Sequence, residues 1–207
     1  MQIDFYKGGG HTAAMNTPPL RIAVYGAAAN PPHLGHMDCL AQLLALGYEL
    51  IYFLPSAGHA FGKTMKPLAQ RLAMAELLVA ERFPGERRIR VSGLEAELAR
   101  PAPDRRVYSI DVLEHLRTVH PQAELHLALG PDNAAPEVFR RFRAYQRLVE
   151  EFGIITLKER IPVRSTWIRA ELGSARPNRE ALERVLGVAL TGHLLSNGLY
   201  KDSASNE

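Results

Sequence analysis

Cysteine is almost absent from this sequence of 207 residues. With Cys39 as the single cysteine, an internal disulfide and a cysteine-based metal cluster are both excluded, which fits a reducing compartment such as the cytoplasm. Long apolar runs are missing as well, because no stretch approaches the roughly 18 residues that a membrane-spanning helix needs. We therefore expect a cytoplasmic protein without a membrane partner, in which Cys39 is a small apolar residue rather than a nucleophile.

Charges of one sign do not accumulate in long runs. The formal net charge is +3, from 25 basic and 22 acidic residues, and the basic runs are no longer than Arg105-Arg106 or the three arginines around Phe142. Scattered cations of this kind are weak evidence for a nucleic-acid partner. The mild basic excess fits an anionic small molecule instead, so no nucleic-acid partner is expected.

Two familiar phosphate-binding motifs are missing. No G-x-G-x-x-G follows the first apolar segment, which argues against a dinucleotide-dependent dehydrogenase. The segment "GHAFGKT" resembles a P-loop, but only three residues separate Gly58 from Gly62 where that loop needs four. Pro67 also interrupts the helix that should follow, so we expect no P-loop here.

Five segments with strand patterns alternate with helical patterns along the chain. Strands are predicted at 20–26, 49–55, 87–93, 123–130 and 152–159, and helices at 34–47, 67–83, 109–120, 136–151, 165–173 and 177–195. This alternation predicts an α/β fold, a Rossmann-like doubly wound parallel sheet of about five strands with helices on both faces. We expect one domain over 19–201, a flexible leader over 1–18 and a loose tail over 202–207.

The segment "NPPHLGH" lies where the first strand passes into the first helix, the end of the sheet at which such folds bind ligands. His33 and His36 flank Gly35 where free helix N–H groups and the helix dipole attract anions. Two imidazoles there can donate hydrogen bonds to a polyphosphate. Two alternatives remain: structural histidines, or a metal pair that takes further ligands from His59, His126 or a carboxylate.

A second cluster, "RSTWIR", begins the predicted helix at 165–173. Ser165 or Thr166 is placed to cap this helix, and Arg169 lies on the same helical face. Two hydroxyls, free N–H groups and a guanidinium can form a second anion clamp. The alternative is an ordinary capped helix with a surface arginine. Trp167 is interpreted as a packing residue.

Together the two clusters resemble the nucleotidylyltransferase superfamily, which is marked by H-x-G-H and S-T-x-x-R. More closely, the chain is similar to the bacterial nicotinate (nicotinamide) mononucleotide adenylyltransferases. The similarity includes "NPPHLGH", "FLPSAGHAFGK", "RLAM", "YSIDVLEHLR", "LHLALGPDN" and "RSTWIR" in the family's order, and it spans residues 21 to about 200.

The resemblance implies roles for individual residues. His33, His36 and Arg169 would be catalytic, with His36 nearest the reacting phosphorus, and Asp132 would accept hydrogen bonds from ribose hydroxyls. The implied ATP-binding residues are Gly26, Ala27, His33, Gly35, His36, Lys63, Gly130, Asp132, Ser165, Thr166 and Arg169. The implied mononucleotide-binding residues are Asn30, His59, Tyr108, Ser109 and Phe142.

Three departures from the family concern the substrate pockets. "AAAN" follows the first strand's sequence where the family usually has a bulkier residue before Asp or Asn. His59 and Lys63 are separated by three residues, whereas the family often has an adjacent pair. The ring-stacking tryptophan after G-x-D is missing, which leaves Phe139, Phe142 or Tyr145 as its replacement.

The activity that the resemblance implies joins ATP and nicotinate mononucleotide into nicotinate adenine dinucleotide and pyrophosphate, in NAD biosynthesis. Mg²⁺ would arrive with ATP rather than occupy a protein metal site. The expected partners are ATP and nicotinate or nicotinamide mononucleotide, and a homo-oligomer stays open. The alternatives are the same chemistry on phosphopantetheine or with CTP, and a non-catalytic nucleotide sensor.

Overall fold

The computed structural model describes residues 18–58, 65–102 and 105–201. The predictions for His59 and Lys63, for nearly all of the leader and for the tail lie outside these residues. The rejected P-loop segment also lies outside them, apart from Gly58.

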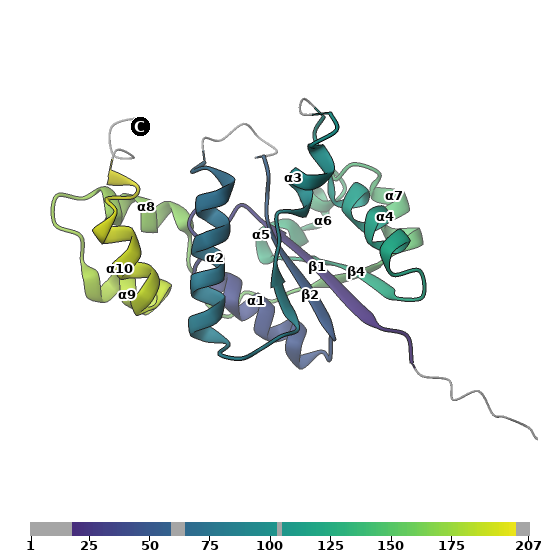
Figure 1. Cartoon of the computed structure of the whole chain (residues 1–207), viewed down its shortest axis with the longest axis horizontal. Helices are drawn as coiled ribbons and strands as arrows, with labels where there is room; N and C mark the ends of the chain where they lie inside the picture. The colour runs from purple at the N-terminus through teal and green to yellow at the C-terminus, as the bar shows by residue number, and fades with distance from the viewer. Residues whose placement is uncertain (1–17, 59–64, 103–104, 202–207) are drawn as a thin grey trace, which may run out of the picture.

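The five predicted strands form one parallel sheet (Figure 1). Their order across the sheet is β3 (Ile89–Val91), β2 (Leu50–Pro55), β1 (Arg21–Ala27), β4 (Glu124–Leu129) and β5 (Gly153–Thr156). Every neighbouring pair is parallel, and Val24 in the central strand lies between Tyr52 of β2 and Leu127 of β4. The predicted doubly wound α/β fold is confirmed.

Helices cover both faces of this sheet because both faces are apolar. In β1, Ala23 and Tyr25 belong to one buried cluster, whereas Ile22 and Val24 belong to the other. Neighbouring strand residues point to opposite faces, so each cluster lies on its own side of the sheet. The first cluster includes α1 (Leu34–Ala45), α2 (Leu68–Arg82), α8 (Ser165–Gly173), α9 (Arg179–Leu186) and α10 (Val188–Ser196). The second includes α3 (Leu94–Ala99), α4 (Ser109–Val119), α6 (Pro136–Phe139) and α7 (Tyr145–Glu151).

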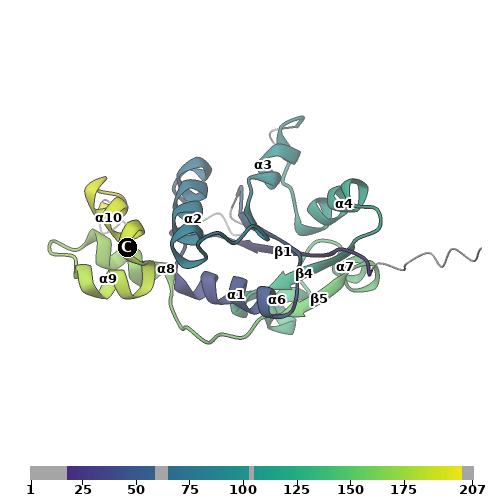
Figure 2. The same ribbon diagram turned by 60° about the horizontal axis from the view of Figure 1, so that its bottom comes forward.

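The C-terminal helices lie beside α2, at one end of the molecule (Figures 1 and 2). Here α10 packs against α2, and α9 packs against α1. This packing carries the end of the chain back toward the segment that follows β1.

The predicted helix over 136–151 is wrong, because the structure divides it into α6 and α7. The break is at Ala144, whose φ of 55° lies in the left-handed region. The buried ring of Phe139 meets the rings of Phe142 and Tyr145 edge to face. Helical spacing in the sequence does not reveal this aromatic cluster, since the turn between the helices brings the rings together.

The predicted helix over 177–195 is also wrong, because it is divided at Gly187, whose φ is 79°. The Glu81 carboxylate of α2 accepts hydrogen bonds from the N–H groups of Val188 and Ala189 at 2.9 and 3.0 Å. A Cβ on Gly187 would lie 2.6 Å from that carboxylate. Glycine therefore permits both the backbone turn and the close approach.

Two strand predictions were too long, and two short helices of the described residues were missed. The edge strand β3 covers Ile89–Val91 rather than 87–93. Strand β5 ends at Thr156 because the chain then leaves the sheet, where the Lys158 backbone N–H and C=O pair with the Gln42 side chain of α1 at 2.9 and 2.8 Å. The missed helices, α3 and α5 (Pro131–Ala134), have six and four residues, too few to show a helical period.

Candidate active site

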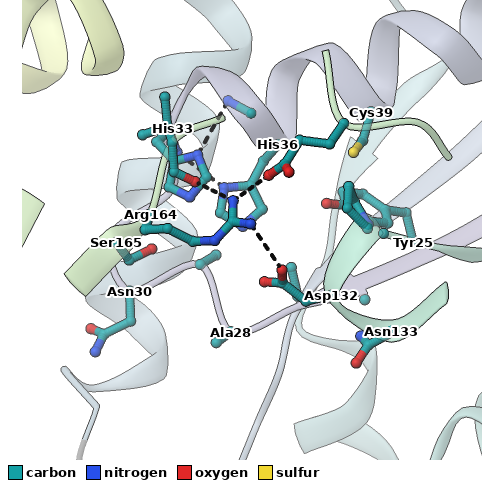
Figure 3. Close-up of a pocket in the computed structure, with 18 of the residues that line it drawn as sticks. Tyr25, Ala28, Asn30, His33, His36, Cys39, Asp132, Asn133, Arg164 and Ser165 are labelled. Carbon is teal, nitrogen blue, oxygen red and sulfur yellow. Dashed lines mark hydrogen bonds and ion pairs between the residues drawn. The ribbon is translucent and has the colours of Figure 1, made fainter. Parts of the chain in front are cut away.

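A cleft of about 600 Å³ opens at the carboxyl ends of β1 and β4, where the strand order reverses (Figure 3). The predicted site residues that line it are Gly26, Ala27, Asn30, His33, Gly35, His36, Gly130, Asp132, Ser165, Thr166 and Arg169. A hydrogen bond of 2.8 Å from Arg169 to the Asn30 carbonyl joins positions that are 139 residues apart. The structure thus brings the two sequence clusters to one cleft.

His33 and His36 lie against each other at the start of α1, with ring centroids 3.9 Å apart. The Nδ1 atom of His33 accepts a hydrogen bond from the Gly35 N–H, and Nδ1 of His36 accepts one from the His33 N–H, both at 3.2 Å. An accepting Nδ1 carries no proton, so each neutral ring has its N–H at Nε2. Both imidazoles are therefore held in one orientation and one tautomer.

Burial keeps both imidazoles neutral. It lowers the pKa of His33 to about 2, with smaller contributions from His36 and from the positive charge of Arg164. Burial also lowers the pKa of His36 to about 4. Near neutral pH, these histidines can donate hydrogen bonds to a ligand but contribute no positive charge.

Lowering the pH from 7.5 to 5.5 should therefore reduce the free energy of unfolding by about 1 kcal/mol for each of these two histidines. The unfolded chain gains the proton near pH 6.5, whereas the buried rings stay neutral. Their contribution to stability is thus complete above pH 6.5 and is lost as the pH falls toward the folded-state pKa. Urea unfolding at both pH values should show a smaller loss, by about 1 kcal/mol, for His36→Gln than for the unaltered chain. Equal losses would contradict the assigned burial.

Position 35 has too little space for a side chain, which explains the glycine between the two histidines. A Cβ at this position would lie 3.0 Å from the His33 ring and 3.1 Å from the carbonyl oxygen of Ile161. The imidazole of His33 therefore occupies the space that any other residue would need.

The "RSTWIR" cluster contacts the histidine loop directly, but not as predicted. Ser165 and Thr166 do not cap α8, because the helix begins at Ser165 and Arg164 is in the cap position. The Ser165 hydroxyl instead donates to the Pro31 carbonyl at 2.9 Å. Arg169 also donates to the Thr166 hydroxyl at 3.3 Å. These contacts, rather than helix capping, fix the start of α8 beside the histidines.

Asn30 connects the histidine loop to two other parts of the chain. Its side-chain carbonyl accepts hydrogen bonds from the Lys66 N–H at 3.1 Å and from the Tyr200 hydroxyl at 2.7 Å. Both Asn30 and Tyr200 are buried, at 6% and 2% exposure. Tyr200 was not predicted for the site, and no local pattern could have indicated it, because its contact with Asn30 spans 170 residues.

Arg71 holds together the loops beside the histidine loop. Its guanidinium is 1% exposed and donates to the backbone carbonyls of Ala28, Ser56 and Lys66 at 2.7–2.8 Å. These carbonyls belong to the loops that follow β1 and β2, so Arg71 is a structural arginine. Cys39 is buried at 2% exposure, as predicted, whereas Trp167 is 44% exposed and is not the packing residue that we expected.

The segment after β4 forms the opposite wall of the cleft. Gly130 precedes the short helix α5 (Pro131–Ala134), and a Cβ there would lie 3.2 Å from the Tyr25 ring. Asp132 is exposed, and its carboxylate lies 3.4 Å from a guanidinium nitrogen of Arg164. Gly26 lies near the end of β1, the strand that pairs with β4, and an added Cβ there would meet no atom within 4 Å.

Tyr108, Ser109 and Phe142 do not line this cleft. Tyr108 belongs to a separate hollow of about 200 Å³, lined by Arg105, Arg106, Tyr108, Asp111 and Arg143. Tyr108, rather than Ser109, is in the cap position of α4, and its N–H donates to the Asp111 carboxylate at 2.8 Å. The mononucleotide role of these three residues stays a prediction.

The cleft carries an excess of cations. Five basic side chains line it, Arg141, Lys158, Arg160, Arg164 and Arg169, against three acidic ones, Asp38, Asp132 and Glu159. Four of these basic residues were not predicted for the site. Lys158 and Arg160 follow β5 at the same end of the sheet as the histidines, which is the positional signal that could have found them.

Two findings from the described residues concern metals and membranes. Within 18–58, 65–102 and 105–201, no group of three or more His, Cys, Asp or Glu side chains is arranged to hold a metal ion. In the same ranges, no helix has the length and apolar composition needed to cross a bilayer.

Comparison with known proteins places the chain in a family. A model described as cytidylyltransferase-like matches residues 24–171. A probable nicotinate-nucleotide adenylyltransferase of Chloroherpeton thalassium is 27% identical over 202 residues, which cover 88% of this chain and 98% of that protein. One from Symbiobacterium thermophilum is 30% identical over 175 residues, covering 82% of this chain and 79% of that protein.

Solved structures share the fold. A putative nicotinate-nucleotide adenylyltransferase from Vibrio parahaemolyticus superposes with a TM-score of 0.70 at 24% identity, over 88% of this chain and 96% of that one. Plasmodium falciparum nicotinic acid mononucleotide adenylyltransferase, complexed with NaAD, gives a TM-score of 0.65 at 15% identity, over 87% and 97%. The fold, the two motif clusters and these sequence matches agree: the chain belongs to the cytidylyltransferase-like family of nucleotidyltransferases, in the branch of the nicotinate-nucleotide adenylyltransferases.

Proposed function

We propose that this chain transfers the adenylyl group of ATP to nicotinate mononucleotide, giving nicotinate adenine dinucleotide and pyrophosphate as a step of NAD biosynthesis in the cytoplasm. The observation that carries the proposal is the convergence of His33, His36 and Arg169 on one cleft at the strand ends. The names of the similar proteins support the choice of acceptor.

In the proposed reaction, an oxygen of the mononucleotide's 5′-phosphate attacks the α-phosphorus of ATP. The bond between that phosphorus and the bridging oxygen breaks, and pyrophosphate leaves with the bonding electrons. The phosphate is itself the nucleophile, so the protein's task is to align the reactants and to stabilise the charge that develops.

The histidines would act as hydrogen-bond donors rather than as acids. Each presents one Nε2–H, because its Nδ1 is engaged by a backbone N–H. Donors that are held in place before reaction need no reorganisation when charge builds on the phosphates. The guanidinium of Arg169 would add full positive charge on the β- and γ-phosphates, beside the Ser165 and Thr166 hydroxyls. Lys63 would reach the phosphates as well.

The nucleoside part of ATP would lie along the opposite wall of the cleft. There, Gly26, Ala27 and Gly130 leave space at the strand ends, and Asp132 would accept hydrogen bonds from the ribose hydroxyls. The mononucleotide would bind near Asn30, with His59, Tyr108, Ser109 and Phe142 as further contacts.

Magnesium would be carried on the triphosphate. Asp38, Asp132 and Glu159 line the cleft, and their carboxylate oxygens suit this ion, directly or through its waters. The ion would neutralise part of the charge on the departing pyrophosphate. The residues present therefore fit a magnesium ion that enters with its nucleotide.

The test is release of pyrophosphate by the purified chain. With ATP, Mg²⁺ and nicotinate mononucleotide, we expect pyrophosphate and nicotinate adenine dinucleotide in equal amounts. Nicotinamide mononucleotide, phosphopantetheine and CTP serve as competing substrates in parallel reactions. Faster turnover of phosphopantetheine or with CTP would refute the assigned acceptor or nucleotide. ATP binding without pyrophosphate release from any acceptor would instead identify a nucleotide sensor.

A further inference from the structure

Arg164 is the first residue of the "RSTWIR" cluster, and it lines the cleft although the sequence predicted no role for it. It immediately precedes α8, and its side chain extends into the cleft toward Asp132 (Figure 3). One guanidinium nitrogen lies 3.4 Å from the Asp132 carboxylate, and the other donates to the Glu159 carboxylate. Arg164 therefore bridges two walls of the cleft, the segment after β4 and the segment after β5.

This bridge is exposed and easily exchanged. The side chains of Arg164 and Asp132 are 51% and 75% exposed, and ion pairs between such groups contribute only about 0–1 kcal/mol. A guanidinium binds a phosphate through two parallel charged hydrogen bonds, which is a stronger interaction than an exposed pair with a carboxylate. A polyphosphate in the cleft would therefore compete successfully for Arg164.

The surroundings of Arg164 place it beside the proposed phosphate position. Its charge acts on the buried ring of His33, and the next residue, Ser165, is bonded to Pro31 in the histidine loop. Because the two histidines are neutral, positive charge for a ligand beside them must come from other side chains, and both Arg164 and Arg169 line the cleft. Arg169 donates to the Asn30 carbonyl and to the Thr166 hydroxyl. Among the residues that the structure describes, the partners of Arg164 are the exchangeable carboxylates of Asp132 and Glu159 and the Val163 carbonyl at 3.2 Å.

We propose that Arg164 is a second phosphate-binding arginine of this site, and that it releases Asp132 when the phosphates of a nucleoside triphosphate take its place. Asp132 then becomes free to accept hydrogen bonds from the ribose hydroxyls. The site would thus engage the ribose fully only when a polyphosphate is already bound. This inference rests on the proposed function for the position of ATP, but it does not depend on the identity of the acceptor.

Binding of the separate parts of ATP to Arg164→Gln tests this inference. Calorimetric titration with inorganic tripolyphosphate, and with ATP, should give dissociation constants at least about tenfold higher than for the unaltered chain, because a charged hydrogen bond is lost. Titration with adenosine alone should give an equal or lower dissociation constant, since Asp132 no longer has Arg164 as a partner. If Arg164 merely supported the fold, its replacement would weaken the binding of both tripolyphosphate and adenosine.

Arg140→Gln is the matched control. This substitution removes the same charge from an exposed residue that does not line the cleft. The affinity of the variant for tripolyphosphate should stay within about twofold of that of the unaltered chain, because salt screens exposed charges at a distance. The proposal is overturned if Arg164→Gln also stays within twofold, if both variants lose affinity equally, or if adenosine binding weakens as much as tripolyphosphate binding. Thermal unfolding of both variants shows that the comparison is between folded proteins.

The outcome is separate from that of the proposed function. These titrations contain no pyridine mononucleotide, so a chain that releases no pyrophosphate can still bind tripolyphosphate through Arg164. Conversely, an active enzyme whose Arg164→Gln variant binds tripolyphosphate normally would retain the proposed function and lose this inference alone.

Discussion

Replacing His36 with alanine is expected to lower kcat for pyrophosphate release by at least about 100-fold, the effect of removing one fixed donor from a site that stabilises developing charge. The ring of His36 is held by the His33 N–H at its Nδ1 atom, so its Nε2–H is the donor that alanine removes. The KM for ATP should change far less than kcat, because the lost hydrogen bond strengthens as charge grows in the transition state.

His193→Ala is a suitable control for this experiment. His193 is an exposed histidine of α10 that does not line the cleft, so its removal should leave kcat unchanged. If His36→Ala keeps near-normal turnover while remaining folded, the catalytic assignment of the histidine pair is wrong. An increase in KM with unchanged kcat would likewise show that His36 only binds the substrate.

Adding a single methyl group at position 35 is expected to have the second largest effect. In Gly35→Ala, the new Cβ would lie 3.0 Å from the His33 ring and 3.1 Å from the Ile161 carbonyl, so the imidazole must move by several tenths of an ångström. Misplacement of a catalytic group by about 1 Å can cost about 100-fold in rate, so we expect kcat to fall by about 10- to 100-fold. Steady-state kinetics with ATP and nicotinate mononucleotide measure this loss.

Gly192→Ala separates this local effect from the general consequences of replacing glycine. Gly192 lies in α10, and a Cβ there meets no atom within 4 Å. That variant should retain full activity and be slightly more stable, since alanine favours the helix by about 1 kcal/mol. Unchanged kcat in Gly35→Ala would show that the His33 ring can shift without loss, and that its observed position is not the catalytic one.

The sheet was predictable because its signals are local. Strand β2 is a short run that is apolar at every position, which indicates a strand covered on both faces, and the segment that contains β3 alternates between polar and apolar residues. The divided helices were not predictable in the same way. At Ala144 the chain turns within an aromatic cluster, and at Gly187 the Glu81 carboxylate of a different helix caps the new start.

The residues of the candidate site also differ in whether local sequence signals reveal them. His33, Gly35 and His36 stand out because a strand end, a glycine and a helix start are adjacent in the chain. Ser165 was recognised, but its contact was predicted wrongly, because a hydroxyl at a helix start can cap that helix or bind a neighbouring loop. Tyr200 was missed altogether, since its partner Asn30 is far away in the chain.

The sequence by itself determined the order of the five strands along the chain, the end of the sheet at which the cleft opens, and the two motif clusters that carry the family resemblance. All of these depend on neighbouring residues, through periodicity, glycine positions and motif spacing. Only the tertiary structure decided which residues of the two clusters touch, that burial keeps both imidazoles neutral, and that Arg164 bridges Asp132 and Glu159 across the cleft. These features arise from burial and from contacts between distant segments, which exist only after the chain has folded.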